Sequence, residues 1–503
     1  MILYLLLRME IMERLTYEDL FKVMKNGNTN LMILGKAGSG KTFLINRLNK
    51  IRNDIILVAP TGIAASNING KTLHSQFGIR EYDYDINTSI EYLNPSSKYL
   101  IKTARILLID EISMCRFDTL DKIDKTCRVI RENEAPFGGL RLIFIGDFYQ
   151  LEPVILNEDI PFIMEHYPEF DGDGGFYKAR CMKNYNYFLN TFEIYNLMHN
   201  FRQGEDKPYQ NILDEVRGGN VSAFTINSLN SRYIESIDYF EYYCNDFHFL
   251  TLSRRKAAYI NNFIMDKLPG DYHRVSPVTT YIRNGIPITR SNLLFPLTMK
   301  EGIKVMFVIN DKCEERKWSN GTFGKILSIS KCGDDIDTVR IAVYSKEGVK
   351  EYNVGREKDF IYGLVFVNNI PYFSSEPISF VENFPFIPAF ATTIHKIQGV
   401  TLDKAALVLD NYVRVPFPNQ IYVGVSRVRT SENLVICDRP LSSLDIKTSE
   451  KYERFINSIK PMMKDVYHIP VTNISNINKT AGIQRPIKIA IKKPLVSSQK
   501  ITG

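Results

Sequence analysis

One octapeptide restricts the possible folds of this chain more than any other feature. Residues 35–42 read G-K-A-G-S-G-K-T and match the pattern G-x-x-x-x-G-K-[ST]. The apolar run Leu31–Leu34 precedes them, and Phe43–Leu48 follows with apolar residues at helical spacing. In the order strand, glycine-rich loop and helix, backbone N–H groups and the positive helix end surround phosphate oxygens. The sequence therefore predicts an α/β domain with a nucleoside triphosphate site; an ordinary glycine-rich turn is the alternative.

The residue types in and after this loop predict hydrolysis as well as binding. Lys41 is expected to reach the β- and γ-phosphates, and the Thr42 hydroxyl is expected to ligate Mg²⁺. A second apolar run ends at the carboxylates Asp110 and Glu111. Asp110 would hold Mg²⁺ through water and Glu111 would polarise the attacking water, although paired acids can also form a solvated turn. The residues expected to bind the nucleotide are Gly35, Lys36, Ala37, Gly38, Ser39, Gly40, Lys41 and Thr42.

The distribution of apolar runs predicts several domains. The chain has 503 residues, of which 44% are hydrophobic and 24% charged, enough for roughly three to four domains. Ile55–Val58 and Leu142–Ile145 are typical of strands buried on both faces of a parallel sheet. From Glu301 to Phe373, short β-rich runs alternate with glycine-containing turns, which indicates a small barrel-like module. Phe390–Thr393 and Ala405–Leu409 then return to the buried-strand pattern, so the module is predicted to be inserted in a second α/β domain.

Charge and cysteine content narrow the class of protein. The seven cysteines are scattered and never form C-x-x-C, so we expect neither a disulfide framework nor a zinc site, and a reducing intracellular compartment. The apolar start Met1–Leu7 is too short to span a bilayer. The net charge of +7 is concentrated in Lys479–Gly503, which has six basic residues and no acid. This tail is predicted to be flexible, and it would either capture DNA or remain solvated.

Several stretches together resemble one family, the PIF-type (petite integration frequency) DNA helicases of superfamily 1B. Val58–Ala65 with Thr72–Ser75 resembles the first strand-contacting motif of that family. Asp110–Met114 resembles its Walker B motif, and Gly146–Leu151 resembles the sensor motif that follows. Asp121–Gly139 is similar to the signature that separates PIF-type enzymes from other superfamily 1 helicases.

The second half of the chain shows the same resemblance. Phe201–Gln203 resembles the arginine motif that opens the second motor domain, and Asn320–Gly324 resembles a turn in the β module. Thr393–Gly399 is similar to T-I-H-K-S-Q-G, and Tyr422–Val428 resembles the final Y-V-A-L-S-R motif. The motifs occur in the family order between roughly residues 15 and 433.

The resemblance implies two RecA-like P-loop motor domains with a small wedge insert and an SH3-like β insert. By residue number, the first motor domain would span 1–200 with the wedge at 79–100, and the second 201–300 and 386–460. The β insert would span 301–385 and the basic tail 461–503. The implied activity is an ATP-dependent DNA helicase in replication, repair or recombination, with telomere maintenance known at family level. It would use ATP and Mg²⁺, move 5′→3′ on single-stranded DNA, and unwind duplex or forked DNA as a monomeric motor unit.

The resemblance also assigns roles to single residues. Arg202 and Arg427, expected in the second domain, would complete the charge at the transition state when the domains close; surface salt bridges are the alternative. Gln150 would sense the γ-phosphate. Residues similar in position to strand contacts are Thr61 and His74 in the first domain and Thr393 and His395 in the second. Phe148 would stack on a base or pack in the core.

Two departures from the family pattern leave alternatives open. Asp19 occupies the place where the family usually has a Gln that reads adenine, so the preference for ATP over other nucleoside triphosphates stays open. The wedge stretch contains Tyr82, Tyr84 and Tyr92, which permit a wedge without proving one. A translocase or remodeller that does not separate strands is a second hypothesis. A non-catalytic nucleic-acid-binding scaffold is a third, against which the intact catalytic residues argue.

Overall fold

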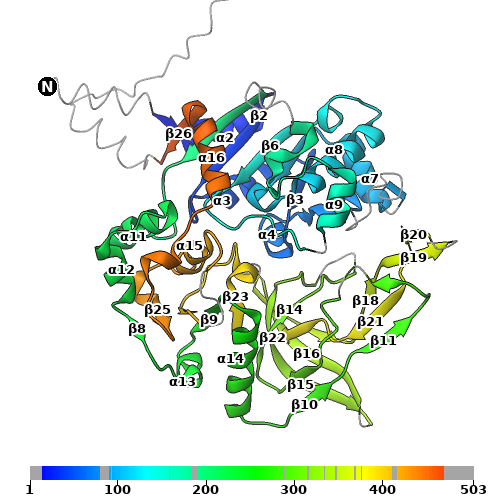
Figure 1. Cartoon of the computed structure of the whole chain (residues 1–503), viewed down its shortest axis with the longest axis vertical. Coiled ribbons are helices and arrows are strands. Elements are labelled where there is room, and N and C mark those ends of the chain that lie inside the picture. Colours follow the sequence, from blue (N-terminus) through cyan, green and yellow to red (C-terminus); the bar gives the residue numbers. More distant parts are fainter. Residues whose placement is uncertain are drawn as a thin grey trace, which may run out of the picture.

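The computed structural model describes most of the chain and divides it into two lobes. The described residues are 14–79, 90–91, 93–157, 159–182, 191–204, 206–287, 289, 291–313, 317–333, 335–345, 348–367, 370–374, 376–410 and 416–468. Figure 1 shows an upper lobe, largely blue and cyan, and a lower lobe, largely green and yellow. We call these the first and the second lobe. Among the described residues, no helix combines the length and apolar character that a membrane crossing requires.

The first lobe is built on an eight-stranded parallel sheet. Four of its strands, Asn30–Gly35, Ile55–Ala59, Ile106–Ile109 and Arg141–Gly146, are almost entirely apolar and buried, as expected for strands covered on both faces. In spatial order the strands are β1 (Leu15–Thr16), β26 (Met463–Tyr467), β7 (Phe192–Leu197), β2 (Asn30–Gly35), β6 (Arg141–Gly146), β5 (Ile106–Ile109), β3 (Ile55–Ala59) and β4 (Lys71–Thr72).

Helices cover both faces of this sheet and form two separate apolar cores. One face is covered by α2 (Tyr17–Asn26), α3 (Lys41–Asn49) and α4 (Gly62–Asn67). The other face is covered by α5 (Leu73–Phe77), α7 (Pro95–Thr103), α8 (Phe117–Arg131), α9 (Ile160–His166) and α16 (Glu450–Ile459). Polar side chains start several of these helices; the Thr16 hydroxyl, for example, accepts a hydrogen bond from the N–H of Asp19 at the start of α2.

The second lobe contains a five-stranded parallel sheet. Its strands in spatial order are β23 (Ala391–Thr393), β9 (His248–Thr251), β24 (Ala405–Val408), β25 (Leu434–Cys437) and β8 (Tyr233–Ile234). The helices of this lobe are α11 (Lys207–Gly218), α12 (Ala223–Asn230), α13 (Tyr239–Cys244), α14 (Arg254–Lys267) and α15 (Gln420–Val425). Short 3-10 helices among the described residues are η1 (Ile112–Met114), η2 (Pro136–Gly139), η3 (Phe176–Lys178), η4 (Arg180–Met182), η5 (Ile394–Ile397), η6 (Ser431–Asn433), η7 (Ser443–Asp445) and η8 (Lys460–Met462).

A β module shares an apolar core with α13 and α14 of this lobe. Its main sheet is antiparallel, with β17 (Gly348–Val354), β16 (Asp335–Ser345), β15 (Phe323–Cys332), β14 (Lys304–Phe307) and β22 (Phe386–Pro388). Three smaller sheets pair β10 (His273–Val275) with β13 (Leu297–Met299), β11 (Val278–Tyr281) with β21 (Ser379–Asn383) and β18 (Glu357–Ile361), and β12 (Ile286–Pro287) with β19 (Gly363–Val367) and β20 (Ile370–Phe373). The module therefore begins near residue 273 and ends near 388, so the predicted bounds of 301–385 were too narrow.

The C-terminal boundary also differs from the prediction. Residues up to 460 were assigned to the second motor domain, but α16 packs on the first lobe through Tyr452, Phe455 and Ile459. Strand β26 then pairs in parallel with β7 and β1, inside the stretch 461–503 that was predicted to be a flexible tail. Figure 1 shows both elements, in orange, within the first lobe. Residues 469–503, which include the basic stretch, lie outside the described residues.

The predicted wedge stretch, 79–100, is described only in part. Residues 80–89 and Tyr92 lie outside the described residues, so the predicted roles of Tyr82, Tyr84 and Tyr92 are not addressed. Helix α7 covers the end of the stretch and anchors it in the first core through Ile101. The wedge therefore stays a prediction.

Candidate active site

The glycine-rich loop joins β2 to α3 as the sequence predicts. Gly38 and Gly40 have φ values of +80° and +87°, which favour glycine. A Cβ on Gly38 would lie 2.4 Å from the Cβ of Arg202, so the loop has no room for a side chain there. The Lys41 ammonium donates to the carbonyl oxygens of Gly35 at 2.7 Å and Lys36 at 3.0 Å. These bonds hold the ammonium group against the loop where phosphates would lie.

A cavity of about 350 Å³ lies beside this loop, a volume suited to a small-molecule ligand. Residues of both lobes and of the connection between them line it. They are Ala37, Gly38, Ser39, Gly40, Lys41, Thr42, Ala64, Asn67, Asp110, Glu111, Gln150, Phe201, Arg202, Gly399, Thr401, Arg427 and Arg429. The cavity thus unites every predicted nucleotide-site residue except Gly35 and Lys36, which instead support Lys41 through their carbonyl groups.

The two predicted carboxylates lie in the wall of the cavity. Asp110 is buried and accepts a hydrogen bond from the N–H of Glu111 at 3.0 Å. Burial raises the pKa of Glu111, as does nearby Asp147, while Lys41 and Arg427 oppose the rise. One carboxylate oxygen of Glu111, Oε2, has no hydrogen-bond partner among the described residues. A buried carboxylate oxygen without a donor suits a group that receives a proton from a bound water.

The cavity wall also offers the oxygen donors that Mg²⁺ prefers. Thr42 and Asp110 both line it, from the start of α3 and the end of β5. Mg²⁺ is usually held by one or two protein oxygens together with waters and substrate phosphates, rather than by a complete protein cage. The hydroxyl and the carboxylate therefore fit a magnesium ion that arrives with a triphosphate.

Two guanidinium groups face this wall. Arg427 is 1% exposed and donates to the carbonyl oxygen of Val423 at 2.7 Å and the Ser426 hydroxyl at 2.7 Å. Burial and the neighbouring Arg202 lower the pKa of Arg427 to about 9. Within the described part of the chain, neither arginine has a carboxylate within salt-bridge distance. A buried cation such as Arg427 and a half-buried one such as Arg202, both without counterions, favour an anionic ligand such as a polyphosphate.

Arg202 does not lie within the second lobe, where the sequence placed it. It follows β7 on the connection between the two sheets, and the preceding Phe201 N–H donates to the carbonyl oxygen of Gly38 at 2.8 Å. Its guanidinium reaches across and donates to the carbonyl oxygen of Ser426 at 2.9 Å. Arg202 therefore joins the phosphate loop to the segment that carries Arg427.

Further contacts join the lobes around the cavity, and the sequence did not identify them. Arg217 of α11 makes an ion pair with Asp147 at 2.9 Å, and Asp147 is fully buried. Asn419, before α15, donates to the carbonyl oxygen of Gln150 at 2.8 Å, while the Ala37 N–H donates to the Tyr422 hydroxyl at 3.3 Å. Gln150 is buried, and its Nε2 donates one hydrogen bond to Asp147 at 3.3 Å. The second hydrogen of this amide group is the one that could donate to a γ-phosphate oxygen. Because these pairs connect distant segments, no local sequence pattern marks the pairing. Of the three partners on the second lobe, Arg217, Asn419 and Tyr422, only Tyr422 lies in a predicted motif.

The predicted strand contacts lie on both sides of the junction between the lobes. The half-buried Thr61 caps α4, and its hydroxyl accepts from the N–H of Ala64 at 3.2 Å. Thr393 ends β23 and His395 lies in η5; both are half-buried. Helix α4 faces this segment, since the Asn67 side chain donates to the carbonyl oxygen of Gly399 at 3.4 Å.

His74 and the predicted β-module turn have different surroundings. His74 is exposed on α5, next to edge strand β4. The turn 320–324 packs on α4 instead, because a Cβ on Gly62 would lie 2.7 Å from the carbonyl oxygen of Asn320. The module therefore braces the helix that Thr61 caps.

Two of the sequence hypotheses concern residues that the structure uses for packing or capping. Phe148 is 2% exposed and packs against Phe176, Tyr452 and Phe455 at ring-centroid distances of 5.7, 5.3 and 5.2 Å. Its ring has no free face on which a base could stack. Of the two roles predicted for Phe148, the structure therefore shows core packing. Asp19 accepts from the Thr16 hydroxyl at 2.6 Å and forms the capping box of α2, which occupies the carboxylate locally.

The signature stretch within 121–139 also has a structural role. Asp121 of α8 accepts from the N–H groups of Arg180 and Cys181, both at 2.9 Å. Asp124 accepts from the N–H of Phe137 at 2.6 Å. These carboxylates anchor the loops that pack around α8.

Comparison with known proteins gives consistent matches. The sequence profile of the PIF1-like helicase family matches residues 13–166. ATP-dependent DNA helicase Pif1 of Bdellovibrio bacteriovorus is 29% identical over 437 residues, covering 85% of this chain and 88% of that protein. ATP-dependent DNA helicase PIF1 of Saccharomyces cerevisiae is 31% identical over 329 residues, covering 62% of this chain and 35% of that protein.

Solved structures match over a similar length. Bacteroides Pif1 bound to ssDNA has a TM-score of 0.71 and 28% identity, covering 88% of this chain and 96% of the other. Pif1 helicase from Bacteroides in complex with ADP-AlF3 and ssDNA has a TM-score of 0.72 and 27% identity, covering 89% of this chain and 97% of the other. The predicted resemblance and the α/β fold with RecA-like lobes are confirmed.

Proposed function

This chain is related to the PIF1-like helicases over most of its length, and we propose that it is an ATP-dependent DNA helicase. It would move 5′→3′ along single-stranded DNA and separate duplex or forked DNA as a monomeric motor unit, inside the cell, during replication, repair or recombination. The observation that carries the proposal is the shared cavity: Lys41 and Glu111 come from the first lobe, and Arg427 comes from the second. A site completed by both lobes can link nucleotide hydrolysis to lobe movement.

The chemistry follows from the positions of these side chains. When bound, Mg²⁺ would be held by Thr42 and Asp110 together with the phosphates, and it would neutralise phosphate charge. Lys41 would bind the β- and γ-phosphates, and the unpartnered oxygen of Glu111 would orient a water and accept its proton. Arg427 and Arg202 would stabilise the charge that develops on the transferred phosphoryl group.

Movement along DNA requires strand contacts that change with the nucleotide. Thr61 on the first lobe and Thr393 with His395 on the second flank the same junction, so lobe closure would change their separation. The α15 segment reaches both the loop at Ala37 and the sensor residue Gln150. A change at the γ-phosphate would therefore change the position of the segment that carries Arg427.

The nucleotide site separates this proposal from a scaffold role. A scaffold would need neither the buried, unpartnered Glu111 oxygen nor two arginines without counterions. A translocase that does not separate strands would use the same site, and only a strand-separation assay distinguishes it. ATP is the proposed nucleotide; the capping role of Asp19 does not direct its carboxylate to a base.

Phosphate release with and without single-stranded DNA tests the proposal. We expect DNA to stimulate release, chelation of Mg²⁺ to stop it, and Lys41→Ala to abolish it, because the phosphates lose their loop cation. The exposed Lys22→Ala serves as a matched control and should retain the wild-type rate. Hydrolysis that persists in Lys41→Ala, or that ignores DNA, would contradict the assignment.

A further inference from the structure

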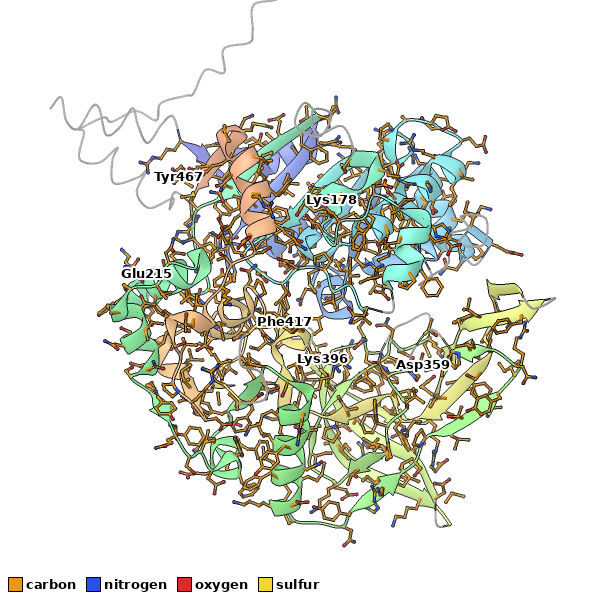
Figure 2. All side chains as sticks on the ribbon, in the orientation of Figure 1. Lys178, Glu215, Asp359, Lys396, Phe417 and Tyr467 are labelled. Carbon is orange, nitrogen blue, oxygen red and sulfur yellow. The ribbon has the colours of Figure 1, made fainter. Side chains whose placement is uncertain are left out.

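Phe417 is a large apolar side chain exposed at the junction between the lobes. It is 65% exposed, whereas Phe148, which was the sequence candidate for a base contact, is 2% exposed. Its ring makes an edge contact with His395, with centroids 6.0 Å apart and planes at 85°. Figure 2 labels Phe417 and Lys396 in the region where the two lobes meet. A single exposed phenylalanine is ordinary on a protein surface, so its surroundings decide whether it has a role.

Those surroundings are basic. The ring contacts His395, and Lys396 follows it in η5. Burial lowers the pKa of both His395 and Lys396. The positive charge of Arg254, at the start of α14, lowers both pKa values further, so the Arg254 guanidinium lies near both side chains. Exposed aromatic rings among basic groups are the composition of sites that bind single-stranded nucleic acid, where bases stack and phosphates meet cations.

The loop that presents the ring is fixed to the nucleotide site. Two residues after Phe417, the buried Asn419 has a φ of +63° and donates to the carbonyl oxygen of Gln150 at 2.8 Å. The Asn419 N–H donates to the carbonyl oxygen of Lys447 at 2.7 Å, and the Phe417 N–H donates to Oε1 of Gln420 at 3.1 Å. The segment that carries the ring is thus tied to the main chain of the sensor residue.

We propose that Phe417 stacks on a nucleobase of the DNA strand that passes between the lobes, with His395 orienting the ring and Arg254 and Lys396 contacting neighbouring phosphates. This inference rests on the proposed function and adds to it a base contact that the sequence did not indicate. Because the ring sits two residues from the bond to Gln150, the stack would shift as the nucleotide site changes.

Binding to intact and abasic oligonucleotides tests the stack. In fluorescence anisotropy with a labelled oligo-dT and a non-hydrolysable ATP analogue, Phe417→Ala should weaken binding by about 5- to 150-fold. On an oligonucleotide of the same length without bases, Phe417→Ala and the wild type should bind equally. Phe224→Ala is the matched control, since Phe224 is 70% exposed but lies on α12. Wild-type affinity of Phe417→Ala for oligo-dT, or an equal loss on the abasic strand, would overturn the inference.

Phe417→Trp gives a direct second readout. The native Trp318 is 5% exposed and stacked on Phe307 at 4.5 Å, so it provides a shielded reference signal in the wild type. Oligo-dT should quench the additional tryptophan and leave the wild-type signal unchanged. Absence of quenching would contradict stacking. If the wild type binds no DNA, the proposed function and this inference fail together. If the wild type binds DNA, but Phe417→Ala binds oligo-dT equally well and Phe417→Trp is not quenched, only this inference fails.

Discussion

The ion pair between Asp147 and Arg217 is expected to hold the two lobes together. Arg217 approaches the fully buried Asp147 carboxylate at 2.9 Å, and its guanidinium lies 4.0 Å above the ring of Tyr149. Burial alone would raise the pKa of Asp147, but Arg217 and Lys41 hold it below the usual value. Arg217→Met keeps the aliphatic stem over Tyr149 and removes only the charge, so it isolates the ion pair.

The structure sets the size of the expected loss. Removing one partner of a buried pair typically costs 3–5 kcal/mol, because the other charge is left without compensation. Asp147 would still accept from the Tyr149 N–H at 3.2 Å and from the Gln150 side chain at 3.3 Å. Arg217 is 23% exposed, which lowers the value further. We therefore expect about 3 kcal/mol, the low end of that range, at neutral pH.

Urea unfolding at several pH values measures this loss through the first unfolding transition. In the wild type the Asp147 pKa is depressed, so the pair stabilises the fold above the unfolded pKa of about 3.9, and this stability is lost as the pH falls through the folded pKa. In Arg217→Met the buried acid becomes easier to protonate, so the deficit should be largest near pH 7.5 and shrink toward pH 4. Adding Asp147→Asn should recover much of the stability, and Arg217→Lys should lose less than Arg217→Met. A deficit below about 0.5 kcal/mol, the scale of an exposed pair, or one independent of pH, would refute the reasoning.

Three further expectations concern catalysis, packing and the basic tail. Arg427→Ala should lower kcat by about 10³–10⁵-fold with a much smaller change in nucleotide affinity. Single-turnover hydrolysis and nucleotide titration measure the two quantities. Lost affinity with an intact kcat would show that Arg427 contributes to ground-state binding instead. Gly321→Ala should cost more stability in thermal unfolding than the control Gly302→Ala, because its Cβ would meet Ile63 at 2.3 Å whereas Gly302 faces open space at a similar φ; equal losses would mean that only backbone strain matters. Deleting Lys479–Gly503 should make DNA binding less salt-dependent, by up to about 0.7 in log–log slope for each lost phosphate contact, at an unchanged ATPase rate with saturating DNA; an unchanged slope would exclude a capture role.

The nucleotide site was predictable because its residues act within short segments. The octapeptide sets its own turn through Gly38 and Gly40, and Asp110 follows its strand directly, so local patterns were sufficient. The contacts from the second lobe around the cavity were not predictable to the same extent. Asn419 and Arg217 meet the first lobe only through tertiary contacts, and a lone Asn or Arg carries no local signal for them.

The errors in the fold have similar physical reasons. Strand β26 joins a sheet whose other strands lie far away in the sequence, and local periodicity does not record that pairing. Helix α16 also packs on the first lobe from a distant part of the sequence. Its residues Tyr452 and Phe455 cover the ring of Phe148, which is why this ring is buried. The β module was drawn too short because all four residues of β11 are exposed, so they give no alternation of buried and exposed positions.

Strand displacement with ATP tests the central claim most directly. The substrates are two DNA duplexes of equal length and sequence, one with a 5′ single-stranded overhang and one with a 3′ overhang. The wild type should displace the strand of the 5′-overhang duplex in an ATP-dependent reaction and leave the 3′-overhang duplex intact. The Lys41→Ala variant should displace neither strand, with or without ATP. Displacement from the 3′ overhang alone would contradict the proposed direction. DNA-stimulated hydrolysis without displacement of either duplex would contradict strand separation and identify a translocase.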